Sequence, residues 1–263
     1  MHKYIQFLTI SWQAGLAYRS GMILWRIRGL LVTIMALSLW SSIFASNGQV
    51  LNYTAAQMNT YIFLVSVLQS VILATALHGL AGTIYHGDLS YWLLRPLNVL
   101  GGLFVHDLTD KLSNFGFALL ESAAFIWLLQ LNIASPTPAT LWLFGLWTIL
   151  AVGLNFIITV LFGCLGFWTN DVWAPKFLFF MLIDATAGKL FPLDILPSAV
   201  QTVVRYTPFP YLSYYQTQLF MNRLQPEQFL GQTLALFAWC LGLGALTLVI
   251  WKRGLRDYEA VGR

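Results

Sequence analysis

Polar and ionisable side chains inside apolar stretches are the first candidates for chemistry in this chain. Glu121 lies in the apolar run Phe115–Leu131, and Gln69 lies in the run Tyr61–Ala81. A carboxylate in hydrocarbon is costly, so its presence there indicates a role in a substrate or proton pathway. Gln69 is a milder case of the same kind. The alternatives for Glu121 are that it faces a polar seam, is protonated, or pairs with a neighbouring subunit.

A second candidate is the segment GDLSYWLLRPLNVLGG at residues 87–102, which lies between two long apolar runs. A loop that only reversed the chain would need far fewer residues. Pro96 ends a helix or sets its start, and so fixes the direction of the element. The charged residues would fix the register of a contact, and the leucines would enter a partner's groove. The charged residues are Asp88 and Arg95, and the apolar face comprises Leu93, Leu94 and Leu97.

Familiar catalytic and metal-binding motifs are missing from the sequence. It contains no P-loop ending in Gly-Lys-Ser/Thr, no His-Glu-x-x-His and no Gly-x-Ser-x-Gly. The spacing of His78, His86 and His106 matches no standard metal motif. Cys164 and Cys240 lie in apolar runs and are interpreted as packing residues. We therefore expect no catalytic residue, metal or cofactor in this chain, and no ATP binding by the chain itself.

Composition indicates a protein that lies in a membrane. The chain is 58% hydrophobic and only 9% charged, whereas soluble domains are about 25% charged. So few charges cannot cover a solvated surface, and a lipid bilayer must do so. The apolar runs are long and continuous, which favours an all-α bundle over a barrel of alternating strands. Nucleic acid is excluded as a partner, because the basic residues flank apolar runs and form no contiguous patch.

The apolar runs predict a single membrane domain over residues 1–263 with six transmembrane helices. Before the first span, Ile5, Leu8 and Trp12 recur at helical spacing. Residues 1–28 are therefore expected to form an amphipathic helix in the plane of the membrane. The spans are expected at about Gly29–Ala45, Tyr61–Ala81, Phe115–Leu131, Thr140–Phe162, Pro175–Ala187 and Phe229–Trp251.

Lysine and arginine residues predict the orientation. With the N-terminus inside, eleven of the fourteen basic residues fall in inside segments, Lys111 among them, and only Lys189, Arg205 and Arg223 remain outside. The positive-inside rule then places both termini in the cytoplasm. It also places residues 82–114 in a cytoplasmic loop.

The last outside segment, residues 188–228, is long and is cut by prolines into pieces too short to span a membrane. Its tyrosines suit a membrane–water boundary. We predict short helices in or on the outer leaflet, buried by protein or lining a water-filled cavity. The alternative is a surface loop without a role in transport. The prolines are Pro192, Pro197, Pro208 and Pro210, and the tyrosines are Tyr206, Tyr211, Tyr214 and Tyr215.

Two of these pieces resemble a known family. GDLSYWLLRPLNVL is similar to a Gly-x-Leu/Asp-x-x-Leu-Leu-x-Pro segment, and FPLDILPSAVQTVVRYTPFPYLSYYQTQLFMNR is similar to a Phe-Pro-Leu…Leu-Pro…Pro-Phe…Tyr pattern. With six spans around them, the chain resembles the permease subunits of bacterial ATP-binding-cassette exporters of the type-two class, closest to the drug and viologen branch. It departs from that pattern at Gln216 and Asn222, where a proline and a glycine are often found.

The resemblance implies the transmembrane subunit of an ATP-driven exporter in the bacterial cytoplasmic (inner) membrane. Such subunits pair with an identical or related permease and with two cytoplasmic ATPase subunits, which hold ATP and Mg. The loop after the second span would be the coupling helix that docks on the ATPase, and its residues here are Gly87, Asp88, Leu93, Leu94, Arg95 and Pro96. The outer-side gate segment would include Phe191, Pro192, Pro197, Pro208 and Phe209, and the substrate pathway would include Gln69 and Glu121.

Two other functions fit the same residues. The chain could be a carrier driven by an ion gradient, with Glu121 as its switch. It could also be a membrane assembly subunit that transports nothing.

Overall fold

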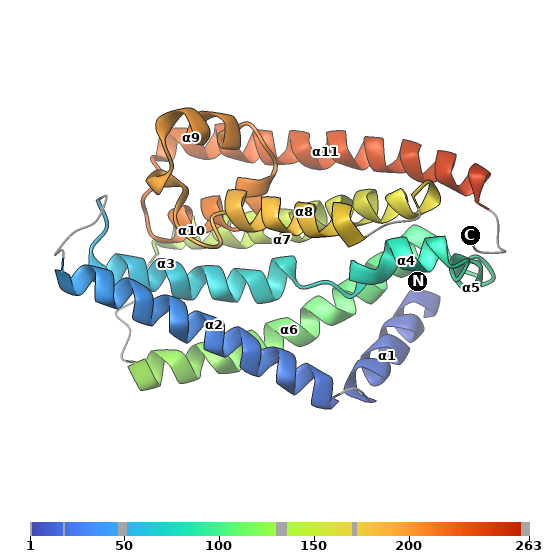
Figure 1. The fold of residues 1–263 in the computed structure, drawn as a ribbon, viewed down its shortest axis with the longest axis horizontal. Coiled ribbons are helices and arrows are strands. Elements are labelled where there is room, and N and C mark those ends of the chain that lie inside the picture. The colour runs from blue at the N-terminus through green and yellow to red at the C-terminus, as the bar shows by residue number, and fades with distance from the viewer. Residues whose placement is uncertain (1, 18, 47–51, 130–135, 170–172, 259–263) are drawn as a thin grey trace.

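The apolar runs fold into long helices in the computed structural model, which describes residues 2–17, 19–46, 52–129, 136–169 and 173–258. Within these ranges every regular element is a helix and no β-strand is found. The prediction of an all-α protein is therefore confirmed. The helices run roughly lengthwise in an elongated bundle (Figure 1).

The bundle is built from a few long helices joined by short ones. The longer helices are α1 (His2–Ala17), α2 (Arg19–Ser46), α3 (Ala55–Leu68), α6 (Val99–Leu129), α7 (Pro138–Gly163), α8 (Trp173–Thr186) and α11 (Pro226–Asp257). The shorter ones are α4 (Leu80–Tyr85), α5 (Leu89–Leu93), α9 (Ser198–Arg205) and α10 (Tyr214–Phe220). Single turns are η1 (Gln69–Leu73), η2 (Ala76–Gly79), η3 (Cys164–Phe167), η4 (Leu193–Ile195) and η5 (Phe209–Leu212).

Four helical stretches are long and apolar enough to cross a membrane, judged by length and composition over the described ranges. They coincide with the first, second, fourth and sixth predicted spans. The predicted third and fifth spans fall on α6 and α8. Helix α6 carries several ionisable residues, and α8, with 14 residues, is only about 21 Å long. The four stretches are Ser20–Ala45, Ala55–Leu73, Pro138–Phe167 and Pro226–Asp257.

The N-terminal helix ends earlier than predicted. We expected one amphipathic helix over residues 1–28, but α1 ends at Ala17 and residues 19–28 belong to α2. The predicted end at residue 28 is therefore wrong. Helix α1 runs obliquely to α2 (Figure 1), and the ring of Tyr4 packs on Gly101 of α6. This contact explains the early end, because α1 turns to cover α6.

Polar side chains fix the start of α3, and a change of backbone geometry ends it. The Thr54 hydroxyl accepts the N–H of Gln57 while the Gln57 side chain accepts the N–H of Thr54, which is a capping box. At its other end α3 passes into η1, a π-helical turn. Ala74 and Thr75 are then extended before η2 begins. The second predicted span therefore ends at Leu73 and does not reach Ala81.

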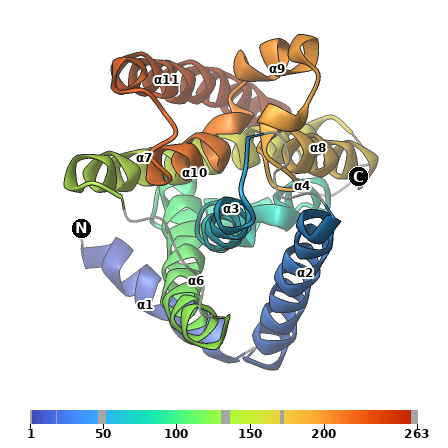
Figure 2. The same ribbon diagram turned by 90° about the vertical axis from the view of Figure 1, so that its left-hand side faces the viewer.

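Helix α3 lies at the centre of the bundle (Figure 2), where other helices surround it. Its Tyr61 and Leu68 are buried against Trp147 and Leu154 of α7 in the main apolar core. By contrast, α2 and α11 expose most of their apolar side chains. A hydrophobic surface of this extent needs a non-aqueous environment, and a bilayer supplies it.

The two ends of the bundle are built differently. One end holds both termini, α4 and α5, and the opposite end holds α9 and α10 (Figure 1). Helices α6, α7 and α11 run between these two ends, whereas α8 covers only the middle part of the bundle (Figure 1).

Glycines allow η3 to pack closely on its neighbours. A Cβ atom at Gly166 would overlap the carbonyl oxygen of Ala81 in α4, and one at Gly254 would overlap the ring of Phe167. Small residues of this kind let helix backbones approach each other in membranes. Because Gly166 and Gly254 have no side chain, α4 and the loop after it pack closely on η3 at the end of α7.

Gly166→Ala is expected to destabilise the protein, because the Ala81 carbonyl belongs to the backbone and cannot rotate away. Overpacking of this kind costs about 1–3 kcal/mol. Thermal melting in detergent measures the loss. The matched control is Gly242→Ala, since nothing lies within 4 Å of a Cβ atom at that position. Equal melting temperatures for the two variants would contradict the close packing of α4 on η3.

Candidate functional site

The predicted contact element is a short, exposed loop between α4 and α6. Gly87 has φ +84°, a left-handed conformation that glycine adopts without strain. This residue turns the chain after α4, and the single-turn helix α5 follows. The loop ends at Asn98, whose side-chain oxygen accepts the N–H of Gly101 in the first turn of α6. All six residues predicted for coupling lie in this loop.

Exposed apolar side chains are the main feature of the loop. Leu94 is 82% exposed and Tyr91 is 68% exposed. Leu93 is also exposed, as are Asp88, Arg95 and Pro96, whereas Gly87 is buried. The loop thus presents leucine and tyrosine side chains to its surroundings beside the charges of Asp88 and Arg95. The sequence prediction that Leu93 and Leu94 form an apolar face agrees with this exposure.

Both ends of the chain hold the loop in place. The Tyr258 hydroxyl donates to the carbonyl of Gly87 at 2.6 Å and accepts the N–H of Ser90 at 3.1 Å. On the other side, the Trp92 ring packs edge-on against Phe7 of α1 at 5.8 Å between centroids. These contacts join the loop to α1 and to Tyr258, which directly follows α11.

Arg95 is tied to the same anchors. Its guanidinium lies 4.5 Å from the centre of the Trp92 ring and 5.2 Å from that of Phe7. These distances are typical of cation–π contacts. Arg95 therefore fixes the loop on α1, a contact partner that the sequence did not indicate.

The extent of the loop differs from the prediction. The cytoplasmic loop expected over residues 82–114 ends at residue 98, because α6 is continuous from Val99. The amphipathic helix in it is also short, since α5 has 5 residues and ends before Pro96. The charges at residues 106–111 suggested a solvated loop, but tertiary contacts described below bury two of them.

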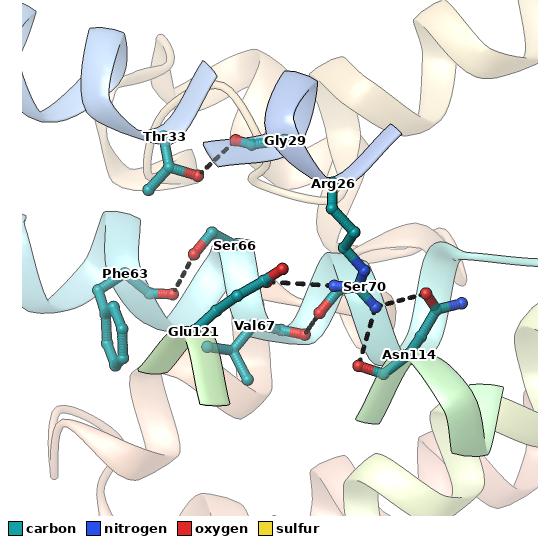
Figure 3. A network of polar contacts seen from close by, with 9 residues as sticks. All are labelled: Arg26, Gly29, Thr33, Phe63, Ser66, Val67, Ser70, Asn114 and Glu121. Atoms are coloured by element: carbon teal, nitrogen blue, oxygen red, sulfur yellow. Dashed lines mark hydrogen bonds and ion pairs between the residues drawn. The ribbon is translucent and has the colours of Figure 1, made fainter. Parts of the chain in front are cut away.

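Glu121 has a basic partner that the sequence analysis did not identify. Arg26 of α2 donates to the Glu121 carboxylate at 3.1 Å and to the backbone carbonyl of Asn114 at 3.0 Å. The two side chains are 12% and 26% exposed. Figure 3 shows this network between α2 and α6, with Ser66 and Ser70 of α3 close by. The alternative that Glu121 faces a polar seam therefore describes its environment best.

Gln69 does not join this network. It ends α3 and begins η1, and no hydrogen bond or ion pair joins it to Glu121 within the described part of the chain. Its backbone carbonyl accepts the N–H of Ala74, which closes the π turn. The structure thus gives Gln69 a position at a helix break. The two residues predicted for a substrate pathway are not brought together.

Prolines organise the opposite end of the molecule. Pro192, Pro197 and Pro208 directly precede η4, α9 and η5, where their fixed φ suits the start of a helical turn. Phe209 begins η5, and its ring lies 6.3 Å from that of Phe179 in α8. Phe191, the remaining residue of the predicted gate segment, is half-buried. The expectation that prolines divide this segment into short helices agrees with these elements.

A half-buried carboxylate that the sequence analysis missed holds this end together. Asp194 accepts hydrogen bonds from the hydroxyls of Tyr53 at 2.7 Å and Tyr214 at 2.6 Å. The side-chain amide of Gln218 donates to it at 3.0 Å. We call Asp194, Tyr53, Tyr214 and Gln218 the Asp194 cluster. It joins the segment before α3 to η4 and α10.

Three of the four tyrosines predicted for the membrane–water boundary are covered by protein. Tyr206 is exposed, but Tyr211, Tyr214 and Tyr215 are buried. A phenol satisfies its hydroxyl in such a place only with a fixed partner. The sequence signal that pointed to this role was Asp194 itself, an acid between prolines in an aromatic segment.

Alkaline pH is expected to weaken the Asp194 cluster. Burial raises the pKa of Tyr214 above its ordinary value, and the neighbouring Asp194 carboxylate raises it further. A group with a raised folded-state pKa stabilises the fold below its unfolded pKa, which is about 10 for tyrosine. The stabilisation is lost as pH rises above that value. Melting temperatures in detergent should therefore fall more steeply above about pH 10 for the native chain than for Tyr214→Phe.

The matched control for this pH series is Tyr206→Phe, because the Tyr206 side chain is exposed. That variant should show the native slope. A Tyr214→Phe variant with the native slope would contradict the assigned role of the Tyr214 phenol.

A buried ion pair closes the break after η1, and the sequence analysis missed this as well. The Lys111 ammonium donates to the carbonyls of Ile72 and Ala74, both at 2.6 Å. It also lies 3.6 Å from the carboxylate of Asp107, one turn earlier in α6. The side chains of Lys111 and Asp107 are 3% and 1% exposed. Thr75, in the break itself, donates to the same carboxylate.

This cluster corrects the assignment of Lys111 to a solvated inside loop. The carbonyls at the end of a helix lack intrahelical partners, and here a lysine from another helix supplies the donor. The signal available in the sequence was the i, i+4 spacing of Asp107 and Lys111.

An all-α bundle with extensive apolar outer surfaces and an anchored contact loop at one end defines a membrane permease. A family model described as "ABC-2 family transporter protein" matches residues 30–262, which is most of the chain. The chain therefore belongs to the ABC-2 family of transporter proteins and is a multi-pass integral membrane protein. Membership implies, in general terms, association with an ATP-binding-cassette partner. No curated protein matches the chain significantly.

Proposed function

We propose that this chain is the transmembrane subunit of an ATP-driven exporter, and that it forms the substrate pathway and couples to separate cytoplasmic ATPase subunits. The observation that carries this proposal is the loop at residues 87–98. It presents Leu94 to the outside and is anchored by Tyr258 and by Phe7 of α1. An anchored apolar contact can transmit a push, because its motion reaches α1, α6 and α11 together.

The proposed topology has six spans, with α6 and α8 as the third and the fifth. Two features support it. The start of α1 and the end of α11 lie at the same end of the bundle, so the number of crossings is even, and α6 runs from that end to the opposite one (Figure 1). The excess of basic residues at the end that holds the termini favours a cytoplasmic location for it. In this topology α9 and α10 lie at the outer side, where the Asp194 cluster would stabilise the gate segment.

The partners proposed are two cytoplasmic ATPase subunits, which bind ATP and Mg, and a second permease subunit, identical or related. The chain itself would hydrolyse no ATP and hold no cofactor. The setting proposed is a bacterial inner membrane, and the branch proposed is that of drug and viologen exporters.

The Arg26–Glu121 ion pair bears on the alternative of a carrier driven by an ion gradient. That alternative relied on Glu121 as an ionisable switch inside an apolar span. Arg26 balances the charge of Glu121 at 3.1 Å, so the acid has a structural role that requires no proton transport. The pair, with Asn114 and the serines of α3, forms a polar seam along which a substrate could move.

Purification of the tagged full-length chain in mild detergent, followed by mass identification of bound proteins, tests the proposal. We expect a P-loop ATPase to co-purify, and we expect substrate movement in reconstituted vesicles to require ATP. The chain without its partner should hydrolyse none. Transport by the chain alone, driven by a proton gradient without ATP, would instead establish the carrier. A chain that co-purifies with no ATPase and transports nothing would support the assembly subunit.

A further inference from the structure

An open groove runs between the last turns of α7 and the last turns of α11. Its volume is about 630 Å³. Leu161 and Leu165 line one wall, and Leu246 and Val249 line the other. The wall formed by α11 is about 10 Å long between residues 246 and 253. This α7–α11 groove is almost wholly apolar and faces outward, as befits a contact with a hydrocarbon chain.

One end of the groove is polar. Both helices run toward the end of the bundle that holds the termini (Figure 1), and Trp168 and Arg253 line the groove there. The groove therefore changes from apolar to cationic in the direction from the middle of the bundle to its end. A phospholipid has the same order of chain and headgroup.

Three cations gather at this end without a partner in the described part of the chain. The side chains of Lys252, Arg253 and Arg256 make no ion pair, hydrogen bond or ring contact with residues in the described ranges. The carboxylate of Asp257, in the last turn of α11, is already engaged, because it accepts the indole N–H of Trp168 at 3.1 Å. Residues 252–257 therefore carry three cations and one acid, which leaves a net positive charge on the last turns of α11.

We propose that the α7–α11 groove binds an anionic phospholipid, with an acyl chain between Leu165 and Val249 and the phosphate at Arg253. Guanidinium binds phosphate oxygens in a bidentate manner, and basic pockets between membrane helices bind anionic headgroups. A helix of a partner subunit would fill the apolar walls but would leave the cations without counter-charge. In the proposed orientation the bound lipid belongs to the cytoplasmic leaflet, and this assignment rests on the proposed function. The binding of the lipid does not depend on it.

Native mass spectrometry of the purified full-length chain tests this site. Dioleoylphosphatidylglycerol and dioleoylphosphatidylcholine, which have the same acyl chains, are added in equal amounts. We expect preferential retention of phosphatidylglycerol, and Arg253→Gln should reduce that preference about fivefold, the usual contribution of one cation near an anionic headgroup. Val249→Trp, which fills the groove, should reduce retention of phosphatidylglycerol by a similar factor.

Matched controls separate the groove from the rest of the lipid-facing surface. Leu241→Trp places the same ring on an exposed face of α11 outside the groove, and Lys3→Gln removes an exposed cation from α1. Both controls should retain the lipid as the native chain does. Equal retention of the two lipids by the native chain would overturn the proposal. So would a loss in Arg253→Gln without a loss in Val249→Trp, because the contact would then involve the headgroup alone.

A Val249→Trp variant that retains the lipid but loses subunit association would also overturn the proposal and would assign the groove to a second permease. Circular dichroism and elution volume identify any variant that fails to fold. None of these measurements requires ATP or transport. A negative result for lipid binding is therefore distinguishable from a negative result for the proposed transport function.

Discussion

Leu94→Asp is expected to abolish most ATP-driven transport while the permease itself remains folded. Leu94 is 82% exposed, so its replacement removes no packing within the chain. In a complex the same side chain would enter an apolar groove on the ATPase. Central apolar anchors of interfaces contribute about 2 kcal/mol or more, which corresponds to about thirtyfold weaker association or more. Transport by vesicles that contain both proteins should fall by at least this factor.

Two measurements make this result specific. The melting temperature of the isolated permease should stay at the native value, and the ATPase should still hydrolyse ATP by itself. Tyr206→Asp is the matched control, because Tyr206 is 80% exposed but lies just after α9, at the opposite end of the bundle. It should transport at the native rate. Transport by Leu94→Asp at the native rate would contradict the assignment of this loop to coupling.

Arg95→Glu is a less clean test of the same contact. Its guanidinium already stacks on Trp92 and Phe7, so a charge reversal also loosens the loop from α1. A fall in both melting temperature and transport is expected for this variant. The comparison with Leu94→Asp separates loss of the partner contact from loss of the loop's own anchor.

Local features of the sequence explain which parts of the fold were predictable. Hydropathy identified four long apolar helices, because each run supplies its own signal over about 20 residues. The short helices before α11 were predictable for the same local reason. Pro197 and Pro208 fix their own backbone φ at the start of α9 and η5. Exposure of Leu94 also followed from a local pattern of leucines beside charges.

The mispredicted features depend on residues far apart in the chain. Arg26 looked like a cation at the membrane surface, but its partner Glu121 lies 95 residues away. The first part of α6 looked like a solvated loop because it is rich in charge. Its charges are buried only because the helix break after η1 lies against them. A contact between distant segments leaves no periodic signal in either of them, so only the fold could reveal these pairs.

Lys111→Met is expected to be among the most destabilising substitutions in the chain. Methionine preserves most of the volume but leaves the buried Asp107 carboxylate without its cation, and the carbonyls of Ile72 and Ala74 without a donor. Removal of one partner from a buried ion pair costs about 3–5 kcal/mol. Thermal melting in detergent should show the loss. Addition of Asp107→Asn should recover part of it, because that change removes the unpaired charge.

A half-buried ion pair of the same residue types, more open to solvent than the Lys111 cluster, is the control. Lys189 lies 2.8 Å from Asp184, and the two side chains are 29% and 23% exposed. Lys189→Met should cost only about 0–1 kcal/mol, as is typical of solvent-accessible pairs. Equal losses for the two variants would show that burial adds nothing to the Lys111 cluster. A larger loss at Lys111 would support its role in holding the break, and through the break the position of α4 and the loop that carries Leu94.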